Sequence, residues 1–570
     1  MDPLRDDRGR RRPRLTAASA AGLLTAARPR AVLAVAAGAL PALAFPAPSL
    51  WWLAHVALVP WILLARSAET GRRAAIDGWL GGLGFMVAVH HWLLPSLHVF
   101  TLVIAALLGL LWAPWGWLVR RFLGGVVTPG RTAAALVVLP SGWLMVELVR
   151  SWEGLGGPWG LLGSSQWQVE PALRLMSVGG VWLVSALIVT VNTAVAALVA
   201  AHAVRPPVTS RASGASHTHG PSRARVTRAV PATAGLVAVA AVTTSAWAWA
   251  PRPEPAGRMR VAVVQPGVID GVGGADRRLA REEALTRGLA GQDLDLVVWG
   301  ESSVGYDLAE RPDVARRIAA LSRQVGADIL VNVDARRSDR PGIFKSSVLV
   351  GPEGPTGDRY DKMRLVPFGE YVPARSLLGW ATSVGKAAGE DRRRGERPVV
   401  MDVGSGLKVG PLVCFESAFP DMSRHLTREG ARLLLAQSST STFQSSWAPE
   451  QHASLAAVRA AETGRPMVHA TLTGVSAVYG AGGERVGTPL GTSASATSTY
   501  DIPLSDGVTP YVRLGDWPVR GALVVLAVLC AAEGVRSLRR PAKRPLSQPA
   551  PEPHGPHART AHGSPAHPGR

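Results

Sequence analysis

Three polar residues in the second half of the chain lie where short extended runs are expected to end. Glu301 follows Val-Val-Trp-Gly, Lys362 follows Tyr-Asp, and Cys414 follows Leu-Lys-Val-Gly-Pro-Leu-Val. A thiolate is a strong nucleophile, a carboxylate can take the thiol proton, and an ammonium can stabilise a developing oxyanion. If the three side chains meet, they predict covalent acyl transfer through sulfur. Each alone has a plainer interpretation: an inert buried thiol, a helix cap and a solvated lysine.

The elements that must position these residues begin near residue 259. From there the chain alternates between short β-rich runs and helical runs, which predicts layered α/β packing with catalytic groups at strand ends. The predicted strands are 260–265, 294–299, 328–334, 346–351, 408–415, 432–436 and 467–471, and the predicted helices are 275–290, 312–324 and 449–463.

Composition indicates a second, membrane-embedded part. The chain has 570 residues, 47% of them hydrophobic, which exceeds a single core and is typical of a membrane protein. The net charge of +20 could suggest nucleic acid. The basic residues concentrate in 5–30, 205–228 and 536–570, which flank apolar runs and are rich in Pro, Gly, Ala or Ser. We therefore interpret them as disordered cytoplasmic segments and expect no nucleic-acid partner.

The two cysteines, Cys414 and Cys530, are not expected to pair. Cys530 lies inside an apolar run, whereas Cys414 lies in the α/β part. No metal-ligand spacing is present, so we expect neither a metal site nor a cofactor. The Cys414 thiol is therefore predicted to be free.

Eight apolar runs predict a polytopic α-helical membrane domain of about eight transmembrane helices. The runs are 31–45, 50–65, 74–94, 99–118, 132–148, 173–200, 234–249 and 519–535. Loops 66–73, 120–131 and 205–228 are basic, whereas the alternate loops 46–49 and 95–98 contain no Lys or Arg. Basic loops stay in the cytoplasm, so both termini are predicted to be cytoplasmic and the α/β part extracytoplasmic.

The predicted domain layout follows from these runs. It comprises a basic N-terminus (1–30), a seven-helix membrane domain (31–250) with a cytoplasmic linker (203–230), a catalytic domain (257–508), an eighth membrane helix (519–535) and a basic tail (536–570). Loop 151–171, rich in Trp and Gly, suits an interfacial, partly re-entrant segment or an ordinary aromatic belt.

Three segments together resemble a known family. They are 297–303 with Glu301, 360–373 with Lys362, and Cys414-Phe415-Glu416. In this order they resemble the Glu-Lys-Cys triad of the nitrilase (carbon-nitrogen hydrolase) superfamily. The extended segment 360–373, with seven predicted spans before the domain and one after it, resembles the apolipoprotein N-acyltransferases. The resemblance covers residues 31 to 535.

That resemblance implies a fold and an activity. The fold is a nitrilase-like αββα sandwich outside the cytoplasm, anchored in the plasma membrane of a bacterium by several spans. The activity is transfer of an acyl chain from a phospholipid to the N-terminal amine of a diacylglyceryl-lipoprotein, in two steps through a thioester.

The resemblance also implies a role for each site residue. Cys414 would be the nucleophile, Glu301 the proton acceptor and Lys362 the oxyanion stabiliser. Glu370 and Glu416 match further acidic positions of the family, and would orient Lys362 and the amine or form structural ion pairs. Trp380, Phe443 and Trp447 lie in segments that would be mobile lids or ordinary loops.

Three departures from the family pattern leave the acceptor and donor open. Gly300 stands for the usual Pro, Phe415 for a common Tyr, and the run 437–443 replaces an Asn-Asp-x-Trp-Phe-Gly pattern. One alternative is a membrane-anchored nitrilase-type amidase or acyltransferase with another acceptor. The second is a non-enzymatic protein that binds a partner such as a membrane glycosyltransferase.

Overall fold

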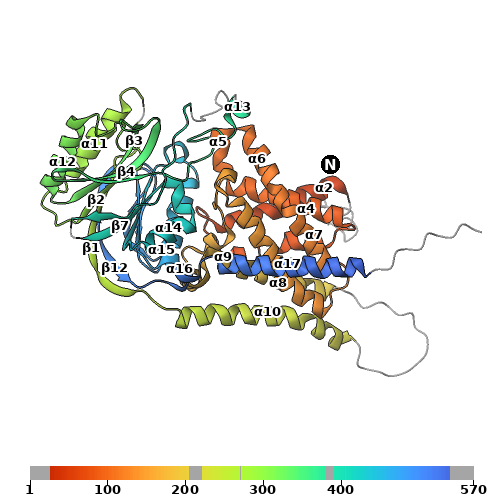
Figure 1. The fold of residues 1–570 in the computed structure, drawn as a ribbon. Coiled ribbons are helices and arrows are strands. Elements are labelled where there is room, and N and C mark those ends of the chain that lie inside the picture. The colour runs from red at the N-terminus through yellow and green to blue at the C-terminus, as the bar shows by residue number, and fades with distance from the viewer. Residues whose placement is uncertain (1–25, 204–220, 270, 380–388, 405, 540–570) are drawn as a thin grey trace, which may run out of the picture. The chain divides into compact units, whose positions relative to one another are not determined.

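The structure is a computed structural model that describes residues 26–203, 221–269, 271–379, 389–404 and 406–539. It divides into two compact units, one ending at Leu526 and the other beginning at Ala527. The first unit contains both β-sheets and nearly all of the helices (Figure 1).

Apolar helices form the N-terminal half. Within the described residues, six helices are long and apolar enough to span a membrane: Ala27–Ala44, Val99–Leu123, Pro129–Arg150, Glu170–His202, Val226–Trp249 and Trp517–Leu538. A pair bent by 63°, Gly71–Val89 with His91–Leu97, would make a seventh. The predicted run 50–65 forms a shorter apolar helical segment, Trp51–Arg66, in which a 3-10 turn, Trp51–His55, precedes the helix Val59–Arg66. Pro60, in the first turn of this helix, has no backbone N–H and so favours a helix start there.

The helices of this half differ widely in length. They are α2 (Ala27–Ala39), α3 (Val59–Arg66), α4 (Gly71–Val89), α5 (Leu94–Leu97), α6 (Val99–Gly109), α7 (Ala113–Leu123), α8 (Pro129–Arg150), α9 (Glu170–Ala203) and α10 (Pro221–Trp249). Helix α9 is kinked at Gly180, whose φ of +67° lies in the left-handed region that glycine tolerates. The Val181 N–H just beyond it donates to Glu462 Oε1 at 2.7 Å.

Two six-stranded sheets form the second half. Their strand orders are β12-β1-β2-β3-β4-β5 and β11-β10-β9-β8-β7-β6. The first contains β1 (Glu254–Gln265), β2 (Leu296–Trp299), β3 (Asp328–Arg336), β4 (Ile343–Gly351), β5 (Gly354–Asp361) and β12 (Ala496–Asp506). The second contains β6 (Met401–Val403), β7 (Leu407–Val413), β8 (Leu433–Ser438), β9 (Met467–Thr471), β10 (Ser476–Tyr479) and β11 (Arg485–Leu490).

The sheets pack face to face between helices. Strands β4 and β7 contact each other across the interface, as do β1 and β9. Helices α11 (Gly274–Arg287) and α12 (Pro312–Val325) cover the first sheet, and α14 (Pro420–Arg428) and α15 (Ala448–Thr463) cover the second (Figure 1). The short helices α13 (Arg375–Leu378) and α16 (Pro510–Leu514) and the long α17 (Trp517–Leu538) complete the chain. The predicted αββα sandwich is thus confirmed.

The parallel strands of each sheet end at the edge where the candidate site lies. Strands β1, β2 and β3 run parallel, and so do β7, β8 and β9. Strands buried on both faces are expected to be continuously apolar, and all four residues of β2 are buried. The carboxyl ends of β2 and β7 lead directly to Glu301 and Cys414.

Candidate active site

Cys414 lies at a strained turn. It follows β7 and opens the short 3-10 helix Cys414–Ala418, and its φ is +53°. A non-glycine residue in that region costs free energy and persists only when its surroundings hold it. The Cys414 carbonyl accepts hydrogen bonds from Ser417 Oγ at 3.0 Å and from His452 Nε2 at 3.0 Å. These two bonds fix the turn that presents the thiol.

Glu301 is placed by a close approach between the two sheets. Its N–H donates to the Ser438 carbonyl at 3.2 Å, across to β8. A Cβ on Gly300 would lie 1.9 Å from the Leu472 nitrogen, so only glycine fits without a backbone shift. The departure at residue 300 therefore allows the two sheets to pack closely at this turn.

The two other departures also have structural partners. Gln437 joins the sheets, because its Nε2 donates to the Trp299 carbonyl at 2.9 Å and its Oε1 accepts from Ser347 Oγ at 2.5 Å. Phe415 packs edge-on against Phe419, with ring centroids 4.9 Å apart. An apolar ring thus occupies the position next to Cys414.

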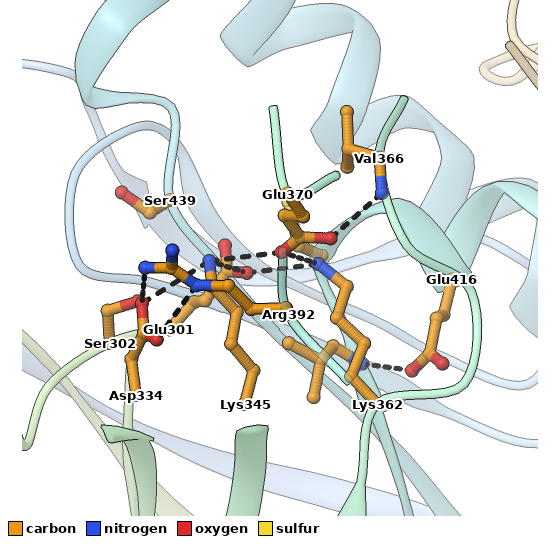
Figure 2. A network of polar contacts seen from close by, with 12 residues as sticks. Glu301, Ser302, Asp334, Lys345, Lys362, Val366, Glu370, Arg392, Glu416 and Ser439 are labelled. Atoms are coloured by element: carbon orange, nitrogen blue, oxygen red, sulfur yellow. Dashed lines mark hydrogen bonds and ion pairs between the residues drawn. The ribbon is translucent and has the colours of Figure 1, made fainter. Parts of the chain in front are cut away.

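Two carboxylates and two ammoniums form a buried network (Figure 2). Lys362 Nζ lies 3.1 Å from Glu301 Oε1 and 2.7 Å from Glu370 Oε1. Lys345 Nζ, from β4, lies 2.8 Å from the same oxygen of Glu301 and 3.1 Å from that of Glu370. Buried charges are tolerated only when they are paired and hydrogen-bonded, and here each ammonium lies between both carboxylates.

The thiol lies beside this network, close enough to Glu301 and Lys362 for their charges to act on its pKa. Burial, and then the Glu301 carboxylate, raise the pKa of the Cys414 thiol to about 12. Burial alone would raise the pKa of Glu301, but the Lys345 and Lys362 ammoniums outweigh it and lower that pKa to about 2. The resting site therefore holds a protonated sulfur beside an ionised carboxylate.

Glu370 and Lys362 are held in the charged form as well. Burial acts against both, but each partner stabilises the other, so the pKa of Glu370 is lowered and that of Lys362 is raised. The second oxygen of Glu370 accepts the Val366 N–H at 2.8 Å. Glu370 thus contacts Lys362 directly.

Glu416, the second supporting carboxylate, binds the backbone on both sides of the site. Its Oε1 accepts from Tyr360 Oη at 2.7 Å and from the backbone N–H groups of Met363 and Arg364 at 2.7 and 3.0 Å. Its Oε2 accepts the Val413 N–H at 2.8 Å. Glu416 therefore ties the chain just after Lys362 to the chain just before Cys414.

Two of the three expected lid residues lie in the part of the chain that the structure describes. Trp380 lies outside the described residues. Phe443 packs against Trp92 with ring centroids 4.9 Å apart, and Trp447 packs against His91 at 4.5 Å. Both aromatic rings thus contact the turn that follows α4, within the first compact unit.

Loop 151–171 also reaches the catalytic half. Trp159 Nε1 donates to Gln451 Oε1 at 2.8 Å, and its ring lies 5.3 Å from that of His452. Glu153 pairs with Arg364 at 3.0 Å. The loop therefore packs against the same helix, α15, whose His452 holds the Cys414 carbonyl.

Sequence reasoning missed two residues of the site, Lys345 and His452. Lys345 interrupts a run of apolar and small residues, Ile-Phe-Lys-Ser-Ser-Val-Leu-Val, and a charged residue inside a buried strand is a signal that it has a partner. His452 lies in a helix of small residues and carries no comparable signal. Its role follows from the packing of α15 against the turn at Cys414.

Two parts of the chain match known protein families. Residues 37–194 match the apolipoprotein N-acyltransferase N-terminal domain, and residues 260–509 match carbon-nitrogen hydrolase. An amidase from Nesterenkonia sp. shares 20% identity and a TM-score of 0.32 over 44% of this chain and 92% of that one.

Curated relatives match over nearly their whole length. The apolipoprotein N-acyltransferase of Geobacter metallireducens is 31% identical over 87% of this chain and 94% of its own. That of Azotobacter vinelandii is 31% identical over 92% of this chain and 98% of its own. The site geometry, both matched domains and these relatives agree, and the chain belongs to the apolipoprotein N-acyltransferase family.

Proposed function

We propose that this bacterial membrane enzyme moves an acyl chain from a phospholipid to the N-terminal amine of a diacylglyceryl-lipoprotein. The observation that carries the proposal is the meeting of a thiol, a carboxylate and an ammonium at one buried point, where Glu301 contacts both Cys414 and Lys362. A nucleophile, a proton acceptor and a cation are the groups that acyl transfer through sulfur requires.

The first half-reaction forms a thioester. The Cys414 proton passes to Glu301 as the sulfur attacks the ester carbonyl of the phospholipid, and Lys362 stabilises the oxyanion. The carbon–oxygen bond of the ester then breaks, and the leaving lysophospholipid alkoxide takes the proton from Glu301. Because the thiol is protonated at rest, proton transfer has to accompany the attack.

The second half-reaction forms the amide. The neutral α-amine of the diacylglyceryl-cysteine attacks the thioester carbonyl, and Glu301 accepts a proton from the nitrogen. The carbon–sulfur bond breaks, and the proton on Glu301 returns to the sulfur to restore the Cys414 thiol. Donor and acceptor use one site in turn, which gives ping-pong kinetics.

The membrane helices fit acyl substrates. Moving a chain from hydrocarbon into water costs about 0.8 kcal/mol for each methylene, so a site that is continuous with the bilayer avoids that cost. We place the catalytic domain (257–508) outside the cytoplasm, between the seven-helix region (31–250) and the last span (519–535), with both termini inside, because the basic loops lie on alternate sides.

Mass spectrometry of the full chain tests the proposal. After incubation with phospholipid alone, we expect an acyl mass on the peptide that contains Cys414 and release of lysophospholipid. Addition of a diacylglyceryl-cysteine peptide should then remove that mass and yield the N-acyl peptide. Cys530→Ser is the matched control, since that cysteine lies in α17 and should leave the reaction unchanged.

Other outcomes identify the alternatives. Release of free fatty acid in place of N-acyl peptide would indicate a hydrolase, and transfer to another amine would indicate a different acceptor. A protein that is never acylated would support the non-enzymatic alternative, with a partner such as a membrane glycosyltransferase. N-acyl peptide at the normal rate from Cys414→Ser would contradict the thioester.

A further inference from the structure

The site contains one more cation than the proposed reaction uses. Lys362 supplies the ammonium for the oxyanion, yet Lys345 approaches the same oxygens of Glu301 and Glu370 at 2.8 and 3.1 Å. In Figure 2 the two lysines reach the carboxylates from neighbouring positions. The ammonium of Lys345 is slightly closer to Glu301 than that of Lys362, which lies at 3.1 Å.

The two lysines differ in their freedom to move. The Lys362 side chain is completely buried, and its ion pairs among the described residues are with Glu301 and Glu370. The Lys345 side chain is 13% exposed and has a third carboxylate within reach, Asp334 Oδ2 at 3.9 Å. Lys345 can therefore exchange Glu301 for a third carboxylate, whereas Lys362 has no third carboxylate among its ion pairs in the described residues.

Asp334 is positioned to accept that ammonium. It lies in β3, next to β4, and its side chain is 16% exposed. Its Oδ2 accepts from Ser302 Oγ at 3.3 Å and from Arg392 Nη2 at 3.4 Å, and its Oδ1 accepts from Arg392 Nε at 3.3 Å (Figure 2). These contacts are longer than those of Glu301 and Glu370 with the lysines. The carboxylate thus has room for a closer partner.

The charges of the resting site oppose transfer of the Cys414 proton to Glu301. With both ammoniums in place the Glu301 carboxylate has a pKa of about 2, whereas the Cys414 thiol has a pKa of about 12, for the reasons given above. The groups that face Glu301 are Lys345 from β4, Lys362 after β5 and Cys414 after β7, with Glu370 beside both lysines. Of the two cations that lower the pKa of Glu301 and so weaken it as a base, Lys345 is the one with a third carboxylate within reach.

We propose that Lys345 is a positioning residue that keeps Glu301 unreactive in the resting enzyme, and that a shift of its ammonium toward Asp334 allows Glu301 to take the Cys414 proton. In this step the S–H bond breaks and an O–H bond forms on Glu301. Lys345 stays protonated throughout, so the total charge of the site does not change. The inference rests on the proposed function for the identity of nucleophile and base.

The direction of the effect follows from which group each ammonium favours. Proton transfer moves negative charge from Glu301 to the sulfur. Lys345 is hydrogen-bonded to Glu301 and is the first charge acting on it, whereas its action on the thiol is weaker than that of Lys362. A cation that is closer to the starting charge than to the final one opposes the transfer. Removal of the Lys345 charge should therefore make the thiol more reactive.

Alkylation of Cys414 tests this without any lipid. The rate of iodoacetamide modification of the full chain in detergent is followed between pH 5 and 8 on the Cys414 peptide. Lys345→Met should raise the rate by up to about tenfold, because loss of one close opposite charge shifts the pKa of a carboxylate by about 1–3 units. Loss of the same charge near the sulfur offsets part of that gain. Lys345→Arg should bring the rate back toward that of the unaltered chain. Lys408→Met, at an exposed position of β7, is the matched control.

A second variant changes the rate in the opposite direction. Asp334→Asn removes the alternative partner, so Lys345 should remain on Glu301 and alkylation should slow. An equal or slower rate for Lys345→Met, or an equal or faster rate for Asp334→Asn, would overturn the inference. The assay needs no acyl donor, so the inference about Lys345 can be wrong while the proposed function holds. The inference can also be right if the acyl acceptor is a different one.

Discussion

Glu301 and Glu416 are both almost fully buried, with 2% and 0% exposure, but the protein holds them by opposite means. Glu301 is held by two ammoniums and a thiol. Glu416 is held by one phenol and three backbone N–H groups. Full charges attract a carboxylate strongly and can move with their side chains, whereas backbone donors have fixed positions.

The difference appears in the protonation of the two groups. Burial is countered at Glu301 by two positive charges, so its pKa falls. At Glu416 burial prevails over its hydrogen bonds, and its pKa is raised. We infer that a carboxylate that must exchange a proton during turnover is surrounded by mobile charge, and that one that only holds the backbone is surrounded by fixed dipoles.

Glutamine substitutions should separate the two roles most clearly. Glu301→Gln should lower the rate of thioester formation by about 10²–10⁴-fold, because the amide cannot accept the thiol proton. Glu416→Gln should instead lower the free energy of unfolding by roughly 1–3 kcal/mol, since its NH₂ group would face donors and leave buried N–H groups unpaired.

Acylation kinetics and thermal unfolding of both variants check this pair. A larger loss of rate in Glu416→Gln than in Glu301→Gln, in protein that remains folded, would remove the distinction between them.

His452 is a third buried group that binds the backbone, and it does so as a neutral side chain. Burial lowers the pKa of His452 from 6.5 to about 4, so at pH 7 the ring is neutral and donates to the Cys414 carbonyl. The unfolded chain binds this proton below pH 6.5 and the folded one only below about 4. Acid should therefore remove stability across that window, by about 3 kcal/mol from this group.

Unfolding midpoints between pH 7 and 4, compared with those of His452→Gln, measure this contribution. His469, whose pKa burial lowers to about 3, should leave part of the acid sensitivity in the variant. An identical pH dependence in the two proteins would show that His452 is not a neutral buried group.

The smallest effect is expected at the edge of the Glu416 site. Tyr360→Phe removes one donor at 2.7 Å but leaves the three backbone donors. We expect a loss of roughly 0.5–1.5 kcal/mol in unfolding free energy, the net contribution of one hydrogen bond, and a nearly unchanged rate of thioester formation. A loss of rate without a loss of stability would place Tyr360 in the chemistry. Thermal unfolding and the acylation assay are read on the same preparation.

The sequence by itself determined the local elements and the order of the reacting groups. Apolar runs that end before Glu301 and Cys414 are local patterns, and the structure places these residues just after β2 and β7. The segment with Lys362 and Glu370 was informative for the same reason, because an eight-residue separation within one loop brings both side chains to one point.

Only the tertiary structure decided which side chains share the site. Lys345 meets Glu301 because β4 and β2 flank β3 in one sheet, and His452 meets Cys414 because α15 packs on the turn after β7. Glu416 binds the backbone after Lys362 instead of its ammonium because long-range packing, which no local pattern encodes, sets the register between these segments. Local sequence fixes periodicity, whereas the contacts between distant elements depend on how their buried faces fit together.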